Sequence, residues 1–158
     1  MLVVADTSAL VALAACDALP ALDQLFKEVR VPVAVFDECT VVGKPESARL
    51  GAYLQGKIVE VDIQELVIAA GRLGQGELEA MALYRRLHAD FLLLDDHRAR
   101  KVARLNGMEV IGSLGMLLRA KEAGLIPEIR PLVTLIQAAG VHYGEPLVAR
   151  TLRLAGEL

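Results

Sequence analysis

Four carboxylates stand where buried segments of the chain give way to loops or helices, and together they could hold a cation. Asp6 ends the apolar run 2–5, and Asp96, with Asp95 beside it, ends the run 91–94. Open sheets of parallel strands bind ligands outside the carboxyl ends of their strands, where these acids are expected. Several carboxylates gathered there need a partner to stay ionised, and a hard divalent cation is the usual one.

Two glutamates in predicted helices complete the set. Glu38 is spaced from neighbouring valines so that it falls on or beside the buried face of its helix. Glu77 and Glu79 flank the apolar stripe of the helix predicted over 75–88, on opposite sides. Glu77 is preferred because it lies slightly closer to that stripe and nearer the helix N-terminus.

The types of these residues indicate which metal they would hold. Carboxylates without His or Cys favour Mg²⁺ or Mn²⁺ over zinc, and such ions can polarise a phosphate and activate a water for attack. Each acid also has an ordinary explanation. Asp6 and Asp96 suit helix N-caps, while Glu38 and Glu77 suit solvent or the positive end of a helix dipole. The sequence leaves open whether Asp95 or Asp96 faces the site.

A basic stripe follows the second acidic pair. Four residues of the helix predicted over 96–106 recur at i, i+3, i+4 and i+7, while the small apolar residues between them face the core. Contacts of this kind position nucleic acid through its phosphates without reading its sequence. An ordinary solvated face is the alternative, and the neighbouring acids favour binding of nucleic acid. The stripe consists of His97, Arg100, Lys101 and Arg104.

Composition limits the class of protein. The 158 residues suffice for one domain with a large core, and a net charge of −3 creates no strong field for nucleic acid, so a polyanion needs a local basic patch or a metal. Cys16 and Cys39 lack zinc-ligand spacing. The longest apolar run, 9–16, is too short to span a bilayer, and no signal peptide is recognised. We therefore expect a cytoplasmic protein without membrane association.

Strands and helices alternate along residues 1–123. This alternation predicts an α/β fold, a three-layer α/β/α sandwich with a mainly parallel central sheet. The segment 33–36 could be strand instead of helix. Strands are predicted over 3–5, 29–31, 57–61, 91–94 and 109–111, and helices over 8–15, 19–26, 32–41, 46–54, 65–73, 75–88, 96–106 and 113–122, with Ser8 and Ser113 as helix caps.

The pattern changes in residues 124–158, where Pro and Gly punctuate two predicted helices, 129–138 and 145–155. We interpret these residues as a helical C-terminal extension packed on the same domain.

At the acidic positions the chain resembles the PIN-domain family. The resemblance rests on Ala5-Asp6-Thr7-Ser8-Ala9-Leu10, the helix with Glu38, the Gly76-Glu77 helix and Leu94-Asp95-Asp96-His97-Arg98, over about residues 1–120. The stretch Ile111-Gly112-Ser113-Leu114-Gly115 and the helical tail are similar to a prokaryotic subfamily related to VapC-type toxins.

The resemblance implies a Rossmann-like or flavodoxin-like fold and a metal-dependent ribonuclease. By the family pattern, Asp6, Glu38, Glu77 and Asp96 are the metal-binding acids, with Asp95 and Glu79 as alternatives and Thr7 or Ser8 in support. It also implies a homodimer and, for a toxin, an antitoxin protein as partner.

Three functions are compatible with these residues and with the resemblance. The leading one is a metal-dependent endoribonuclease that cleaves single-stranded RNA, with a toxin role. The alternative is a catalytically weak or inactive PIN-like module that binds RNA or protein. A metal-dependent phosphatase is weaker because position 8 carries Ser8 rather than a second aspartate.

Overall fold

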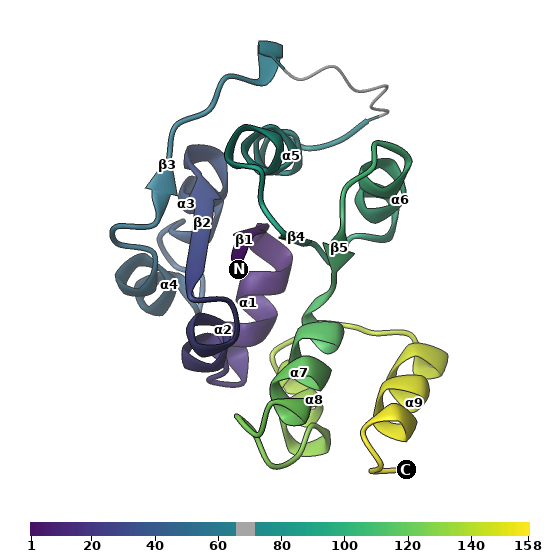
Figure 1. The fold of residues 1–158 in the computed structure, drawn as a ribbon. Coiled ribbons are helices and arrows are strands. Elements are labelled where there is room, and N and C mark those ends of the chain that lie inside the picture. Colours follow the sequence, from purple (N-terminus) through teal and green to yellow (C-terminus); the bar gives the residue numbers. More distant parts are fainter. Residues whose placement is uncertain (66–71) are drawn as a thin grey trace.

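A parallel sheet forms the centre of the protein. The computed structural model describes residues 1–65 and 72–158 (Figure 1). All strand pairings in the sheet are parallel, in the order β3-β2-β1-β4-β5. The predicted α/β class with a mainly parallel sheet is therefore confirmed. The strands are β1 (Leu2–Ala5), β2 (Glu28–Pro32), β3 (Ile58–Val59), β4 (Phe91–Leu93) and β5 (Val110–Ile111).

Helices cover both faces of this sheet. Side chains of β1 alternate between two apolar cores, since Val3 and Ala5 belong to the larger core and Val4 to the smaller one. Helices α5 (Gln75–Leu87) and α6 (His97–Leu105) pack on the smaller core. The larger core takes residues from α1 (Thr7–Ala15), α2 (Leu19–Phe26), α3 (Val33–Cys39), α4 (Ser47–Tyr53), α7 (Ser113–Glu122), α8 (Arg130–Ala138) and α9 (Glu145–Leu154).

Local chemistry sets the start of α3. Pro32 occupies the position before its first turn, where a missing N–H costs nothing. Val35 and Cys39, four residues apart, are both buried against the larger core. Residues 33–36 are therefore helical, and the alternative of a strand there is wrong.

Other boundaries differ from the predictions. The strand expected over 57–61 shrinks to β3 at the sheet edge, where only one neighbour supplies hydrogen bonds. Most of the helix predicted over 65–73 lies outside the described residues, and a 3-10 turn at Ile63–Glu65 precedes that gap. Ser8 and Ser113 are not caps, because Asp6 and Gly112 hold the N-cap positions.

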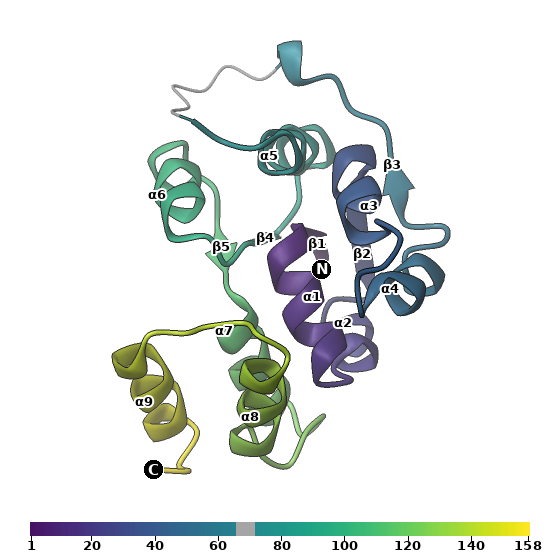
Figure 2. The same cartoon turned by 180° about the vertical axis from the view of Figure 1, so that it is seen from behind.

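The last two helices lie on the same body as the sheet. Ile129, Val133, Ile136 and Leu152 join the larger core. Figures 1 and 2 place α7, α8 and α9 at the end of the molecule opposite α5. The division of the chain after residue 123 stays a prediction.

The helices of the described residues are short compared with membrane-spanning helices. In residues 1–65 and 72–158, no single helix has the length and apolar character to cross a membrane. Helices α1 and α2 meet that criterion only when joined, by length and composition, and a bend of 118° separates them.

Candidate functional site

The direction of the chain reverses between β1 and β4. From β1 the chain proceeds to β2 and β3 on one side, and it returns for β4 and β5 on the other. Ala5 pairs with Leu93, and the backbone N–H of Asp6 donates to the carbonyl oxygen of Leu93 at 2.9 Å. The carboxyl ends of β1 and β4 are therefore neighbours at a topological switch point, the usual ligand position in open α/β sheets.

Asp6 lies at this point and is 4% exposed. It holds the N-cap position of α1, but its side chain makes no capping hydrogen bond. Within the described residues its Oδ1 is buried without a hydrogen-bond partner. Burial raises the pKa of Asp6 to about 7; Glu77, Glu38 and Asp95 raise it too, while a hydrogen bond from the Thr7 amide opposes them. Helix capping therefore does not explain this aspartate.

Glu38 reaches the same region from α3. The Thr7 hydroxyl donates to Glu38 Oε2 at 2.7 Å. A Cβ added at Gly76 would lie 2.5 Å from Glu38 Oε1, so the first turn of α5 presses against this carboxylate. In the sequence, Gly76 stood out only as part of the Gly76-Glu77 motif, although a glycine inside a first turn was an available signal of close packing.

The thiol next to Glu38 is also covered. Cys39 ends α3 and is buried. Burial raises the pKa of Cys39 to about 12, and the charges of Asp6 and Glu38 act in the same direction, against a hydrogen bond with Thr7. The thiol therefore stays protonated beside the acids.

Glu77 and Glu79 have different surroundings. Glu77 Oε1 accepts a hydrogen bond from the Gly74 amide at 3.3 Å, while its Oε2 is buried without a partner in the described part of the chain. Burial raises the pKa of Glu77, as do the charges of Asp96 and Glu38, whereas the Gly74 amide and Arg98 lower it.

Glu79 uses both carboxylate oxygens elsewhere. Its Oε1 accepts from the Ala34 amide at 3.1 Å, and its Oε2 accepts from Gln75 Nε2 at 2.7 Å. The geometry therefore favours Glu77 over Glu79 as a possible metal ligand, because a carboxylate oxygen of Glu77 has no hydrogen-bond partner in the described residues.

Asp95 and Asp96 both raise the pKa of another site acid, but their side chains have different hydrogen-bond partners. Asp96 Oδ2 accepts from the Ala99 amide at 2.8 Å and caps α6, and its charge raises the pKa of Glu77. Asp95 accepts from the backbone N–H and from the hydroxyl of Ser113, each at 2.7 Å. The charge of Asp95 raises the pKa of Asp6.

Ser113 was missed as a site residue. It is fully buried, and its hydroxyl lies 2.6 Å from the hydroxyl of Tyr143. A Cβ at Gly112 would lie 3.0 Å from Asp95 Oδ1, so this glycine allows the close approach. The motif 111–115 entered the sequence argument only through the family resemblance. Nothing in the sequence indicated Tyr143 as a site residue, because all the predicted site residues lie before residue 124.

The basic stripe of α6 is divided in the structure. His97, Arg100 and Arg104 line a cavity of about 940 Å³, together with Asp95 and Asp96. Lys101 is not among the lining residues. Arg100 Nη1 donates to the Leu94 carbonyl at 2.9 Å, so this side chain holds the end of β4.

The acids at the ends of β1 and β4 offer oxygen donors to a metal ion but are not closely grouped. In residues 1–65 and 72–158, no three His, Cys, Asp or Glu side chains are grouped closely enough to hold a metal ion. The unpaired oxygens of Asp6 and Glu77 are nevertheless the hard donors that Mg²⁺ or Mn²⁺ prefers. The donor chemistry fits such an ion, and ligation by three acids at once requires rotation of side chains. The metal-binding role of these acids stays a prediction.

A doubly wound sheet with acids at its switch point defines an α/β domain with a candidate ligand site at the ends of β1 and β4. The family model DUF3368, described as a PIN domain, matches residues 2–157, and the chain belongs to the PIN-domain family. The predicted family is therefore confirmed, and the match includes α8 and α9. Comparisons with curated proteins and with solved structures found no match.

Family membership has a general functional meaning. PIN domains are in general nucleases and typically use divalent metals, so a nuclease-type function is indicated for this chain.

Proposed function

We propose that this protein is a metal-dependent endoribonuclease that cleaves phosphodiester bonds of single-stranded RNA. One observation carries the proposal: among the described residues, no donor reaches the buried oxygens Asp6 Oδ1 and Glu77 Oε2, which lie near other carboxylates. Leaving such oxygens unpaired is costly, and a cation would offset that cost.

The residues proposed to hold the ion are Asp6, Glu38, Glu77 and Asp96. Their oxygen-only chemistry favours Mg²⁺ or Mn²⁺. When bound, such an ion would polarise a phosphodiester and make water a better nucleophile. The Thr7 hydroxyl orients Glu38, and Ser113 orients Asp95. The surrounding core excludes water from Asp6, which strengthens its interaction with any cation.

A second candidate is a PIN-like module that binds RNA or protein without cutting. One observation favours it: no three acidic, His or Cys side chains of the described residues are grouped closely enough to hold an ion. A site that never assembles would bind metal weakly and leave RNA intact.

Cleavage of a labelled single-stranded RNA, with Mn²⁺, with Mg²⁺ or with EDTA, tests both candidates. We expect cleavage only with metal and its loss in Asp6→Asn and Glu77→Gln. Asp37→Asn is the matched control, since Asp37 is an exposed acid beside Glu38. Undiminished cleavage in EDTA or by Asp6→Asn would contradict the proposal, and intact RNA bound by wild type would favour the module.

The family resemblance supports three further proposals. They are a toxin role in a toxin–antitoxin pair, an antitoxin protein as partner, and a homodimer in the cytoplasm. Induced expression should arrest growth for wild type but not for Asp6→Asn, and light scattering should give twice the mass of the chain. Normal growth under wild-type expression would contradict the toxin role.

A further inference from the structure

A second feature of the molecule extends away from the acids. The cavity of about 940 Å³ begins at Ser8, Asp95 and Asp96 and continues between α6, α7, α9 and residues 141–144. Its volume is near the upper end for small-molecule pockets, about 300–1,000 Å³. It is therefore large enough for a segment of an extended ligand rather than a single ion.

Helix α9 presents one face to this cavity. Its lining residues recur at i, i+3, i+4 and i+7, the spacing of a single helical face. Leu152 lies on another face and packs into the larger core, which holds α9 in place. The lining residues of α9 are Leu147, Arg150, Thr151 and Leu154.

Two of the arginines that line the cavity come from different helices. Arg104 of α6 and Arg150 of α9 are exposed, and within the described residues neither forms an ion pair or a side-chain hydrogen bond. Arg49 and Lys121, by contrast, are paired with acids. Unpaired cations on facing walls attract an anion to the space between them.

The charges along the cavity are unequally distributed. Three arginines line it, and His97 and His142 add hydrogen-bonding groups, while among the described residues the acids that line it are Asp95 and Asp96, where the cavity meets the candidate metal site. An anionic chain can therefore lie along the basic walls and reach the acids at one end. The remaining lining is partly apolar, with Leu114, Leu118 and Val141.

We propose that this cavity binds the sugar-phosphate backbone of single-stranded RNA, with α9 as one wall and Arg150 and Arg104 contacting phosphates. The inference rests on the proposed function, whose reaction needs RNA at the acidic end. Unpaired bases have apolar faces that suit the leucine and valine lining. Helix α9 thus makes the protein's own C-terminal region part of the substrate site.

Binding of a fluorescein-labelled single-stranded RNA of about 12 nucleotides tests this site, because single-strand sites span about 4–16 nucleotides. Fluorescence anisotropy in EDTA separates binding from metal-dependent cleavage. We expect Arg150→Gln and Arg104→Gln each to weaken binding about fivefold and to reduce the slope of log K against log salt by about 0.7.

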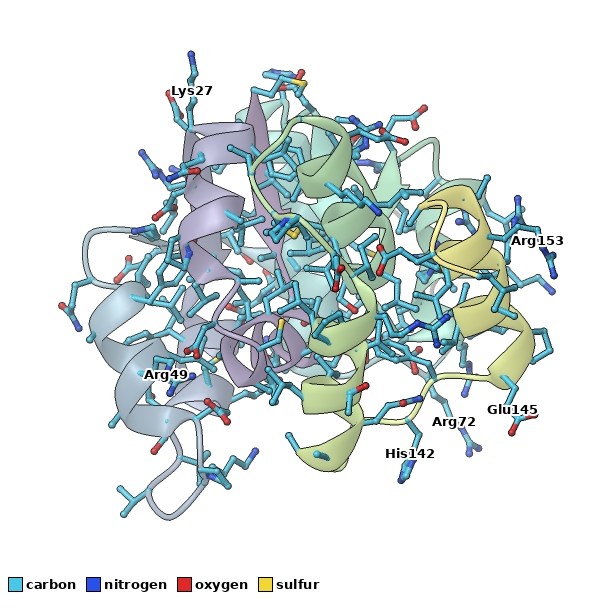
Figure 3. The ribbon with its side chains drawn as sticks, turned by 90° about the horizontal axis from the view of Figure 1, so that it is seen from below. Lys27, Arg49, Arg72, His142, Glu145 and Arg153 are labelled. Carbon is cyan, nitrogen blue, oxygen red and sulfur yellow. The ribbon has the colours of Figure 1, made fainter. Side chains whose placement is uncertain are left out.

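A matched control carries the same charge change outside the cavity. Arg153 lies on α9 and points away from the rest of the molecule in Figure 3, and it does not line the cavity. Arg153→Gln should therefore bind RNA nearly as wild type does. Because Arg150 is exposed and unpaired among the described residues, its replacement should leave the melting temperature unchanged.

The outcomes separate this inference from the nuclease proposal. If Arg150→Gln binds RNA as Arg153→Gln does, the α9 wall is overturned even when cleavage persists. If RNA binds with dependence on Arg150 but is never cut with Mn²⁺, the site stands and the nuclease proposal fails. If a polyglutamate peptide binds with dependence on Arg150 and RNA does not, the cavity belongs to an acidic protein segment and the RNA assignment is wrong.

Discussion

Glu157 and Asp6 are covered carboxylates in two different regions. Near α8, Glu157 is 11% exposed and accepts from the amides of Ile129 and Arg130 and from Lys121 Nζ, at 2.8–3.0 Å. Burial acts to raise its pKa, but these donors outweigh burial and lower it. Asp6, at the end of β1, has an oxygen without any donor in the described residues, and its pKa is raised to about 7.

The difference shows how a carboxylate that holds the fold together differs from one available to a ligand. Glu157 has its positive partners within the protein, so it gains nothing from an added cation. Asp6 is surrounded by further negative charge, so its ionised form is unstable until positive charge arrives from outside. Four predictions test this contrast.

The largest expected effect is on catalysis. Replacing Asp6 by Asn removes a hard ligand, and RNA cleavage with Mn²⁺ should fall about a thousandfold, or about 4 kcal/mol. Initial rates on a labelled RNA measure this loss. Asp37→Asn should cut at nearly the wild-type rate, and equal rates for both variants would remove Asp6 from the site.

The next effect concerns pH and the metal-free protein. The pKa of Asp6 is raised in the folded state, so its stabilising contribution is complete below the unfolded pKa near 4 and disappears as pH rises through about 7. This contribution to the free energy of unfolding is at most about 4 kcal/mol, because the pKa rises by about 3 and each step of one is worth about 1.36 kcal/mol. The pKa of Glu157 is lowered in the folded state. Its ionised form therefore stabilises the fold at pH values above its unfolded pKa, and this stabilisation is lost as pH falls through its folded pKa.

Urea unfolding in EDTA between pH 4 and 8 measures these slopes. Wild type should lose stability relative to Asp6→Asn as pH rises, and Asp6→Asn should be the more stable of the two at pH 8. Parallel curves for the two proteins would show that Asp6 is not strained as an anion.

A smaller effect is expected at the other carboxylate. Glu157→Gln loses the ion pair with Lys121 and weakens the amide hydrogen bonds, so unfolding free energy should fall by about 1–2 kcal/mol. RNA cleavage per folded molecule should stay at the wild-type level. Glu128→Gln, at an exposed acid of the same region, is the control. A loss of cleavage without a loss of stability would contradict the assignment.

The last effect, of similar size, concerns close packing at the acids. In Gly76→Ala the new Cβ meets Glu38 Oε1, so this carboxylate must move, and we expect cleavage to fall about tenfold, or about 1.4 kcal/mol. Stability should change little, because better helix propensity offsets the displacement. Gly51→Ala places its Cβ 3.5 Å from Thr40 and should leave cleavage unchanged. Normal cleavage by Gly76→Ala would show that the position of Glu38 is unimportant.

The sequence predicted the parallel sheet, because buried runs that alternate with helices obey the simple geometry of parallel strands. It could not predict which oxygens are paired. The bonds from Ser113 to Asp95, and the approach of Gly76 to Glu38, depend on how separate elements meet.

The basic stripe shows the same limit. Helical spacing grouped Lys101 with Arg104, yet only Arg104 lines the cavity, because the opposite wall is α9. The spacing of residues within α6 cannot predict where α9 packs in the fold. Similarly, β3 is shorter than its apolar pattern, and among the described residues it lies at the edge of the sheet, paired with β2.

The two thiols have a practical consequence. Cys16 and Cys39 are buried, and burial raises the pKa of each, to about 11 and about 12. Since only thiolates react readily with alkylating agents and peroxide, both sulfurs should resist such reagents while the chain stays folded. Rapid labelling of Cys39 by iodoacetamide would then report the opening of α3, and rapid labelling of Cys16 would report exposure of the end of α1.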